Sequence, residues 1–133
     1  MITIESYNEE WPLIFKNEEL ALKKLLPDLL NLYHVGSTSV PGLSAKPIID
    51  IIAAVKDRQA CIGPLEKLGY VYKGEYNIPF RSYFNKEGFN LHMYEECHPE
   101  IELNLCFRDY LRSHPDACKE YAALKKQLAD KAD

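Results

Sequence analysis

The sequence predicts a mixed α+β (α/β) fold, in which helices flank a mixed β-sheet of about four to five strands. Helical and strand-like stretches alternate in the first half, a hairpin pattern follows, and two helical stretches end the sequence. The 133 residues contain no internal repeat, low-complexity tract or Gly/Ser linker. We therefore expect one domain over residues 1–133.

The first predicted element is a helix over residues 8–30. Its apolar side chains recur at spacings of three, four and seven residues, which places them near one helix face. Pro12 suits the first turn, where a missing N–H costs no hydrogen bond, and Pro27 ends or kinks the helix. The apolar side chains of this face are Trp11, Phe15, Leu22, Leu25 and Leu29.

Two predicted strands follow, with turn residues between them. Residues 32–35 form a short strand that ends at the Gly-Ser-Thr-Ser run of 36–39, and residues 40–43 form a turn or a short helical turn. Residues 47–55 are apolar except for Asp50, which is typical of a central strand buried on both faces.

The second half predicts a helix, three strands and two more helices. Gly69 ends the first of these helices, and Pro115 divides the last two because proline disfavours helix at the residue before it. The turn at residues 86–88 joins two strands as a hairpin. The helices are predicted at 57–68, 99–113 and 115 to about 129, and the strands at 70–72, 81–85 and 89–94.

The composition excludes several classes of function. A net charge of −4 gives no broad basic face, so we expect no binding to duplex nucleic acid, although a small anionic ligand fits a local basic pocket. No signal peptide opens the sequence and no apolar run reaches the roughly 20 residues of a membrane helix. The four cysteines form no C-x-x-C pair. We expect a cytoplasmic protein with reduced cysteines and no membrane association.

The chemistry is concentrated between residues 34 and 52. Gly36 ends a predicted strand and allows close approach of a ligand, and the hydroxyls of Ser37 and Thr38 follow it, which suits phosphate oxygens. Asp50 is a lone carboxylate in an apolar strand, where an ionised group needs a partner or a metal ion. Beside a phosphate turn it is a candidate Mg²⁺ ligand. The alternatives are a simple strand-ending turn and a carboxylate that caps backbone N–H groups.

This sequence resembles the GrpB family, which is grouped with the nucleotidyltransferase superfamily. The resemblance covers most of the chain. It rests on an N-terminal signature, a central block and C-terminal signatures in the same order. These are Tyr7 with Trp11-Pro12 and Phe15, then residues 34–43 and 45–51, then Leu91-His92, residues 107–112, Tyr121 and Leu124-Lys125.

The resemblance implies a nucleotidyltransferase-like fold in which Gly36 and Ser37 hold a phosphate chain and Asp50 is the catalytic carboxylate that holds a divalent metal, Mg²⁺. The superfamily pattern is acid-hydrophobic-acid, but Ile52 occupies the place of the second acid. Two-metal phosphoryl transfer needs several carboxylates. The candidates for the further ligand are Glu75, Glu95, Glu102 and His92.

Several cations are candidates for phosphate contact. Lys46 lies between the turn and the apolar strand, and Arg108 and Arg112 share one helix face at a spacing of four. Each has a plain alternative as a solvated or surface-paired residue. Arg81 and Lys86 are weaker candidates of the same kind. His34 and His92 lie on predicted strands, as ligands or as hydrogen-bonded core residues, and His34 could orient the turn.

The leading hypothesis is a nucleotidyltransferase-like domain that binds a nucleotide or another small phosphorylated ligand with Mg²⁺. If it is an enzyme, it transfers a nucleotidyl group to a small molecule or a protein. The alternative is a non-catalytic binding or regulatory module on the same fold, which Ile52 favours. A third option is an interaction protein in which the turn at residues 36–39 has a structural role and binds no ligand. The sequence leaves the protein partner and enzyme activity open.

Overall fold

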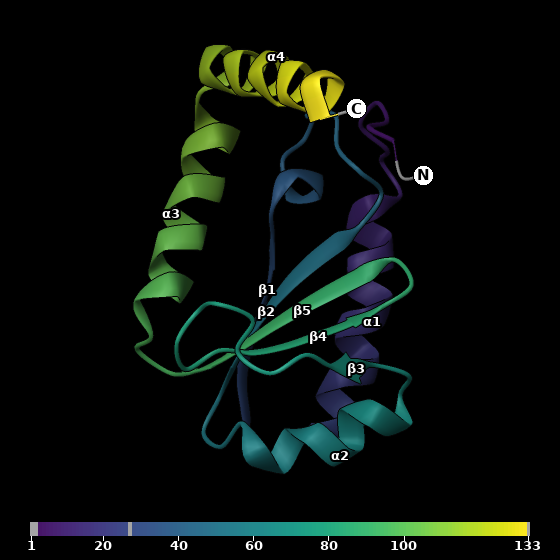
Figure 1. The fold of residues 1–133 in the computed structure, drawn as a ribbon, viewed down its shortest axis with the longest axis vertical. Helices are drawn as coiled ribbons and strands as arrows, with labels where there is room; N and C mark the ends of the chain where they lie inside the picture. The colour runs from purple at the N-terminus through teal and green to yellow at the C-terminus, as the bar shows by residue number, and fades with distance from the viewer. Residues whose placement is uncertain (1–2, 27, 133) are drawn as a thin grey trace.

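One five-stranded mixed sheet organises the computed structural model, which describes residues 3–26 and 28–132 (Figure 1). The strand order is β1-β2-β5-β4-β3, and the helices lie on both faces of the sheet. The helices are α1 (Trp11–Leu25), the 3-10 helix η1 (Ser37–Ser39), α2 (Gln59–Lys67), α3 (Pro99–Ser113) and α4 (Pro115–Ala132). The strands are β1 (Leu29–Val35), β2 (Ile49–Val55), β3 (Val71–Tyr72), β4 (Ser82–Lys86) and β5 (Phe89–Glu95).

Strand β2 lies inside the sheet and has a different relation to each neighbour. It pairs antiparallel with β1 and parallel with β5, and β5 pairs antiparallel with β4. The register sets Val35 beside Asp50 and Asp50 beside Asn90. Paired side chains point to the same face of a sheet, so these three residues share one face near the start of β2. The mixed α+β fold with a five-stranded sheet confirms the predicted fold class.

The opposite face of the sheet carries the larger core. Helices α1 and α2 cover it, and Leu22 and Leu65 are fully buried there. The alternation of β2 sends Ile49, Ile51 and Ala53 into this core and leaves Asp50 on the other face. The predicted burial of β2 is therefore correct, and the exception, Asp50, is partly exposed.

The first helix is shorter than its apolar periodicity predicts. It ends at Leu25, and residues that were expected to continue it form the start of β1. The cause is tertiary, because Leu29 pairs with Val55 across the sheet and strand hydrogen bonds replace helical ones. The predicted break at Pro27 lies outside the described residues. Asp28, at φ 57°, makes the turn between the two elements.

The remaining elements follow the predictions closely. Helix α3 has the predicted bounds, and the β4–β5 hairpin is present with shifts of one residue at its ends. Helix α4 starts at Pro115 after a non-helical His114, as expected. No helix among the described residues is long and apolar enough to cross a membrane.

Helices α3 and α4 bend around the Asp50 face of the sheet (Figure 1). The start of α3 packs on Ile52 and Tyr94. The end of α3 packs through Leu111 on Cys118 of α4 and on Val40 and Leu43, which follow η1. This arrangement covers the sheet at two places. The space between them is the candidate site.

Candidate functional site

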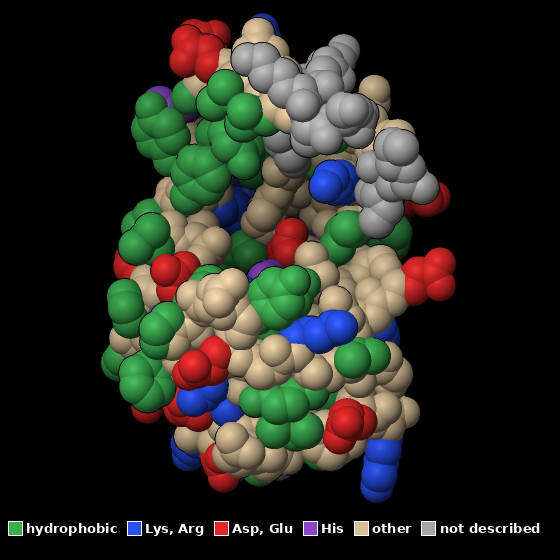
Figure 2. All heavy atoms as spheres, in the orientation of Figure 1, with side chains coloured by type: hydrophobic (Ala, Val, Ile, Leu, Met, Phe, Trp, Pro, Cys, Tyr) green, Lys and Arg blue, Asp and Glu red, His purple; other side chains and the backbone are tan. Residues whose placement is uncertain are grey.

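Three pockets meet at Asp50, and together we call them the Asp50 groove. The Arg108 pocket encloses about 280 Å³, the Glu100 pocket about 240 Å³ and the Lys46 pocket about 220 Å³. Figure 2 shows a hollow on this face below α4, with acidic, basic and histidine side chains on its walls. The lining of the Arg108 pocket includes Gly36, Ser37, Phe107, Arg108 and Tyr121. The lining of the Glu100 pocket includes Ile52, Ile78, Arg81, His92 and Glu100. The lining of the Lys46 pocket includes Ser37, Thr38, Lys46 and Asn90.

Gly36 is the point where the turn touches Asp50. Its backbone has φ 75° and ψ −175°, a combination that is essentially restricted to glycine. A Cβ atom at this position would lie 2.7 Å from Oδ2 of Asp50, closer than real Cβ contacts. Glycine is therefore required here for two independent reasons. The consequence is a carboxylate packed directly against the backbone of the turn.

His92 and Arg81 hold Asp50 from the other side. Nε2 of His92 lies 3.1 Å from Oδ1 of Asp50, and an NH1 group of Arg81 lies 3.2 Å from Nδ1 of His92. A guanidinium only donates hydrogen bonds, so Nδ1 must accept. The proton of a neutral His92 is then on Nε2, which donates to Asp50. The ring also stacks on Tyr83 at 5.3 Å.

Arg81 is itself fixed, since it is 7% exposed and donates to the backbone carbonyls of Glu75 and Tyr76. It lines the groove, but through its contact with His92 its main role is to orient that ring. Lys86, the other weaker candidate cation, lies away from the groove in an ion pair with Glu18 at 2.7 Å.

His34 supports the turn from the opposite face of the sheet. It is buried, stacks on Phe15 at 4.9 Å and has Nε2 2.9 Å from Oγ1 of Thr38. Thr38 donates to the carbonyl of Ile48, so its oxygen accepts from His34. Burial, with smaller contributions from Arg112 and Arg108, lowers the pKa of His34 to about 4. His34 therefore orients the turn as a neutral ring and lies outside the three pockets of the groove.

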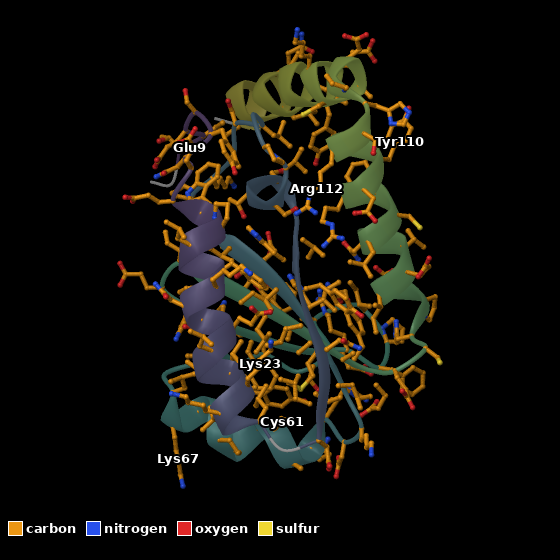
Figure 3. All side chains as sticks on the ribbon, turned by 180° about the vertical axis from the view of Figure 1, so that it is seen from behind. Glu9, Lys23, Cys61, Lys67, Tyr110 and Arg112 are labelled. Atoms are coloured by element: carbon orange, nitrogen blue, oxygen red, sulfur yellow. The ribbon has the colours of Figure 1, made fainter. Side chains whose placement is uncertain are left out.

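The two arginines of α3 hold the ends of the turn by its carbonyl groups. Arg108 donates to the carbonyl of His34 at 3.1 Å, and Arg112 donates to that of Ser39 at 2.9 Å. Figure 3 shows Arg112 between α3 and η1. Burial is the main cause that lowers the pKa of Arg112, and Arg108 adds to it. Arg108 also lines the groove, whereas Arg112 lies outside the three pockets.

The contact of Arg112 gives a stability prediction. Arg112→Met keeps an apolar stem but leaves the carbonyl of the buried Ser39 without this donor. We expect the free energy of unfolding to fall by about 1–2 kcal/mol, measured by urea denaturation. Lys119→Met, which removes an exposed cation from α4, is the matched control. Equal losses in the two variants would mean that Arg112 does not hold the turn.

Of the four candidates for a further metal ligand, His92 lies at Asp50 and the three carboxylates do not. Glu95 pairs with Arg58 at 2.7 Å, Glu75 accepts from the backbone N–H of Phe80, and Glu102 is exposed. None of the three lines the Asp50 groove. For Glu95 the reason is the register, which pairs it with Val55 at the end of β2 that lies far from Asp50.

The donor set around Asp50 is too small for a resident two-metal centre. Among the described residues, no group of three or more His, Cys, Asp or Glu side chains could hold a metal ion. Ile52, two residues along the same strand face, is 1% exposed and packs in an apolar cluster with Val35 and Tyr94. Asp50 with its neighbour His92 fits only an ion that brings most of its own ligands.

Sequence reasoning missed several residues that line the groove. Asn90 lies beside Asp50 in the register and accepts from the hydroxyl of Tyr83 at 2.9 Å. Glu100 and Asn104 come from the first turns of α3, where Asn104 donates to the carbonyl of Glu100 at 2.7 Å. The parallel pairing of β2 with β5 was the missing information for Asn90. No local signal predicts where α3 crosses the sheet.

Comparisons with known proteins agree across the whole chain. The family described as GrpB protein matches residues 1–133. The UPF0157 protein YqkA of Bacillus subtilis is 46% identical over 136 residues, which is 96% of this chain and 40% of YqkA. The UPF0157 protein PA4798 of Pseudomonas aeruginosa is 40% identical over 90% of this chain and 53% of its own length. The chain thus spans about half the length of these curated relatives.

A solved structure gives the same answer. The crystal structure of conserved protein GrpB from Enterococcus faecalis is similar with a TM-score of 0.90 at 37% identity, over 97% of this chain and 84% of that one. The glutamate-rich protein GrpB of Alkalihalophilus pseudofirmus is 30% identical over 98% of this chain and 82% of its own length. Family, sequence relatives and fold point to one assignment: the chain belongs to the GrpB family.

Proposed function

We propose that the Asp50 groove binds a small phosphorylated ligand, such as a nucleotide, as a binding module without the carboxylate set of a two-metal transferase. The observation that carries the proposal is the convergence of three pockets on one carboxylate packed against a glycine-serine turn. Such a convergence of polar groups in a preformed concave site is typical of ligand binding.

The charges of the groove suit a phosphate group at the turn. Ser37 lines two pockets, one of which also contains Arg108 and the other Lys46, and both cations would offset anionic charge there, although Arg108 also pairs with Asp109 at 2.8 Å. Beyond Ser37, the Arg108 pocket has an apolar wall that would take the body of the ligand. This wall includes Val40, Phe107, Leu111 and Tyr121.

A divalent ion has a limited role in this proposal. Mg²⁺ is commonly held by one or two carboxylates together with substrate phosphates and water. Asp50 would hold such an ion, and the N–H of His92 would fix the carboxylate as an outer partner. The protein offers only one carboxylate at the turn among the described residues, so the other ligands of the ion come from the phosphate and water. We therefore expect the ion to bind together with the phosphorylated ligand.

Thermal denaturation with ATP tests the proposal. At a free ATP concentration of a hundred times its dissociation constant, mass action adds about 2.7 kcal/mol to the stability of the folded state. We expect a Tm increase with ATP and Mg²⁺, and a smaller one with inorganic triphosphate, which has no body for the apolar wall. Asp50→Asn should remove the part of the increase that depends on Mg²⁺ and leave the fold intact.

The control is Asp116→Asn, which changes an exposed acid at the start of α4. It should behave like the unchanged protein. An Asp50→Asn protein with a full Mg²⁺-dependent increase would remove Asp50 from the site. No increase with ATP or with the other nucleoside triphosphates would reject nucleotide binding. Nucleotidyl transfer to a second compound would instead revive the enzyme hypothesis.

A further inference from the structure

The Glu100 pocket shares Gly36 and Asp50 with the Arg108 pocket, but the phosphate proposal gives no role to its other walls. It is lined by His92 and Tyr94 of β5 and by Glu100 and Asn104 of the first turns of α3. Its volume of about 240 Å³ admits only a small compound. The question is which compound its walls would recognise.

The floor of this pocket is mostly apolar and well packed. Val35, Ile52 and Tyr94 are each at most 3% exposed and pack as one cluster. Ile78, from the loop before β4, is partly buried against the same cluster and lines the pocket. The pocket is therefore preformed and suits an apolar group.

The polar rim carries more negative than positive charge. Asp50 and Glu100 contribute two carboxylates, and Arg81 contributes one guanidinium. Arg81 directs its N–H groups at two backbone carbonyls and at His92, and it also hydrogen-bonds the side chain of Tyr94. His92 accepts from Arg81, so it is neutral in this arrangement and adds no positive charge.

Glu100 is placed in the pocket by the start of α3. His98 caps the helix, with its Nδ1 accepting from the backbone N–H of Glu100 at 3.1 Å. Asn104, one helical turn later, donates from its Nδ2 to Oε2 of Glu100 at 3.3 Å. Both side chains line the pocket, and so does the carboxylate of Asp50.

We propose that the Glu100 pocket binds a small primary amine, whose ammonium group lies between Asp50 and Glu100 and whose apolar part rests on Ile52, Ile78 and Tyr94. The proposal goes beyond the phosphate site and does not require it. A cation is selected because the ionised groups of the pocket sum to a negative charge and charge-assisted hydrogen bonds are the strong ones. An anion of the same shape would face two carboxylates.

Three probes of similar shape test whether the pocket selects a positively charged ligand. They are 2-phenylethylamine, 2-phenylethanol and phenylacetate, titrated at neutral pH into the ¹⁵N-labelled full chain and followed by amide chemical shifts. We expect saturable shifts with the amine at residues around the pocket, including Ile78, Tyr94 and Asn104. The alcohol should bind at least about tenfold more weakly, and phenylacetate not at all.

Two variants of α3 test the role of Glu100. Glu100→Gln should weaken binding of 2-phenylethylamine about tenfold or more and leave the alcohol unchanged. Glu102→Gln, an exposed acid on the same helix, should change nothing. Ile78→Trp fills the pocket from the loop and should abolish binding of 2-phenylethylamine and the weaker binding of 2-phenylethanol. Circular dichroism checks that each variant is folded.

The proposal is overturned by equal binding of the three probes, by preference for phenylacetate, or by an unchanged affinity in Glu100→Gln. Amine shifts spread along the exposed apolar residues of α3 and α4 instead of the pocket would also overturn it. ATP binding, measured separately, reports on the phosphate site. Amine binding without ATP binding would therefore leave this inference standing while the proposed function failed.

Discussion

Gly36→Ala is expected to destabilise the protein and disable the groove together. The backbone conformation at Gly36 costs a residue with a side chain about 1–3 kcal/mol. The new methyl group would also lie 2.7 Å from Oδ2 of Asp50, so the carboxylate must move and its bond to His92 must change. We expect the free energy of unfolding to fall by more than the backbone cost alone, and the ATP-dependent rise in Tm to disappear.

A second glycine separates the two causes. Gly42 also has a positive φ, 85°, but a Cβ atom there meets nothing within 4 Å. Gly42→Ala should therefore show a backbone penalty only, with ATP binding kept. In the double variant Gly36→Ala with Asp50→Ala, the 2.7 Å contact with Oδ2 is removed while the Cβ of residue 50 stays at 3.2 Å, so part of the lost stability should return. Additive effects of Gly36→Ala and Asp50→Ala would show that the contact carries no energy.

Acid should destabilise the turn through His34. Its pKa in the folded protein is lowered from 6.5 to about 4, so the unfolded chain binds a proton first as the pH falls. Stability from this residue is thus fully present above pH 6.5 and is lost as the pH falls from 6.5 through about 4. Once the pH is below about 4, protonation of His34 has lowered the free energy of unfolding by about 3 kcal/mol.

His34→Gln isolates this contribution. Glutamine keeps an N–H donor for Thr38 but does not titrate, so its stability should fall less steeply between pH 6.5 and pH 4. Urea denaturation at a series of pH values measures the two slopes. The other acids and histidines titrate in both proteins and cancel in the difference. Parallel slopes would mean that His34 is protonated as easily in the folded chain as in the unfolded one.

The sequence by itself determined the elements whose signals are local. The Pro99 start, the Pro115 break and the Lys-Glu-Gly hairpin turn act through neighbouring residues, and the structure has α3, α4 and the β4–β5 hairpin where these signals place them. The apolar run around Asp50 predicts a buried strand in the same way. Gly36 directly follows β1 and Asp50 lies in β2, and their proximity follows from the pairing of Val35 with Asp50.

The tertiary structure alone decided what surrounds Asp50 and where the first helix ends. Leu29 has helical periodicity, but its pairing with Val55 outweighs this weak local preference. His92 reaches Asp50 because β5 lies parallel to β2, and the order of strands in a sheet is not encoded by any short window. Glu100 enters the groove only because α3 crosses this face, which depends on apolar packing between residues far apart in sequence. Local chemistry therefore identified the turn and its carboxylate, whereas long-range packing selected their partners.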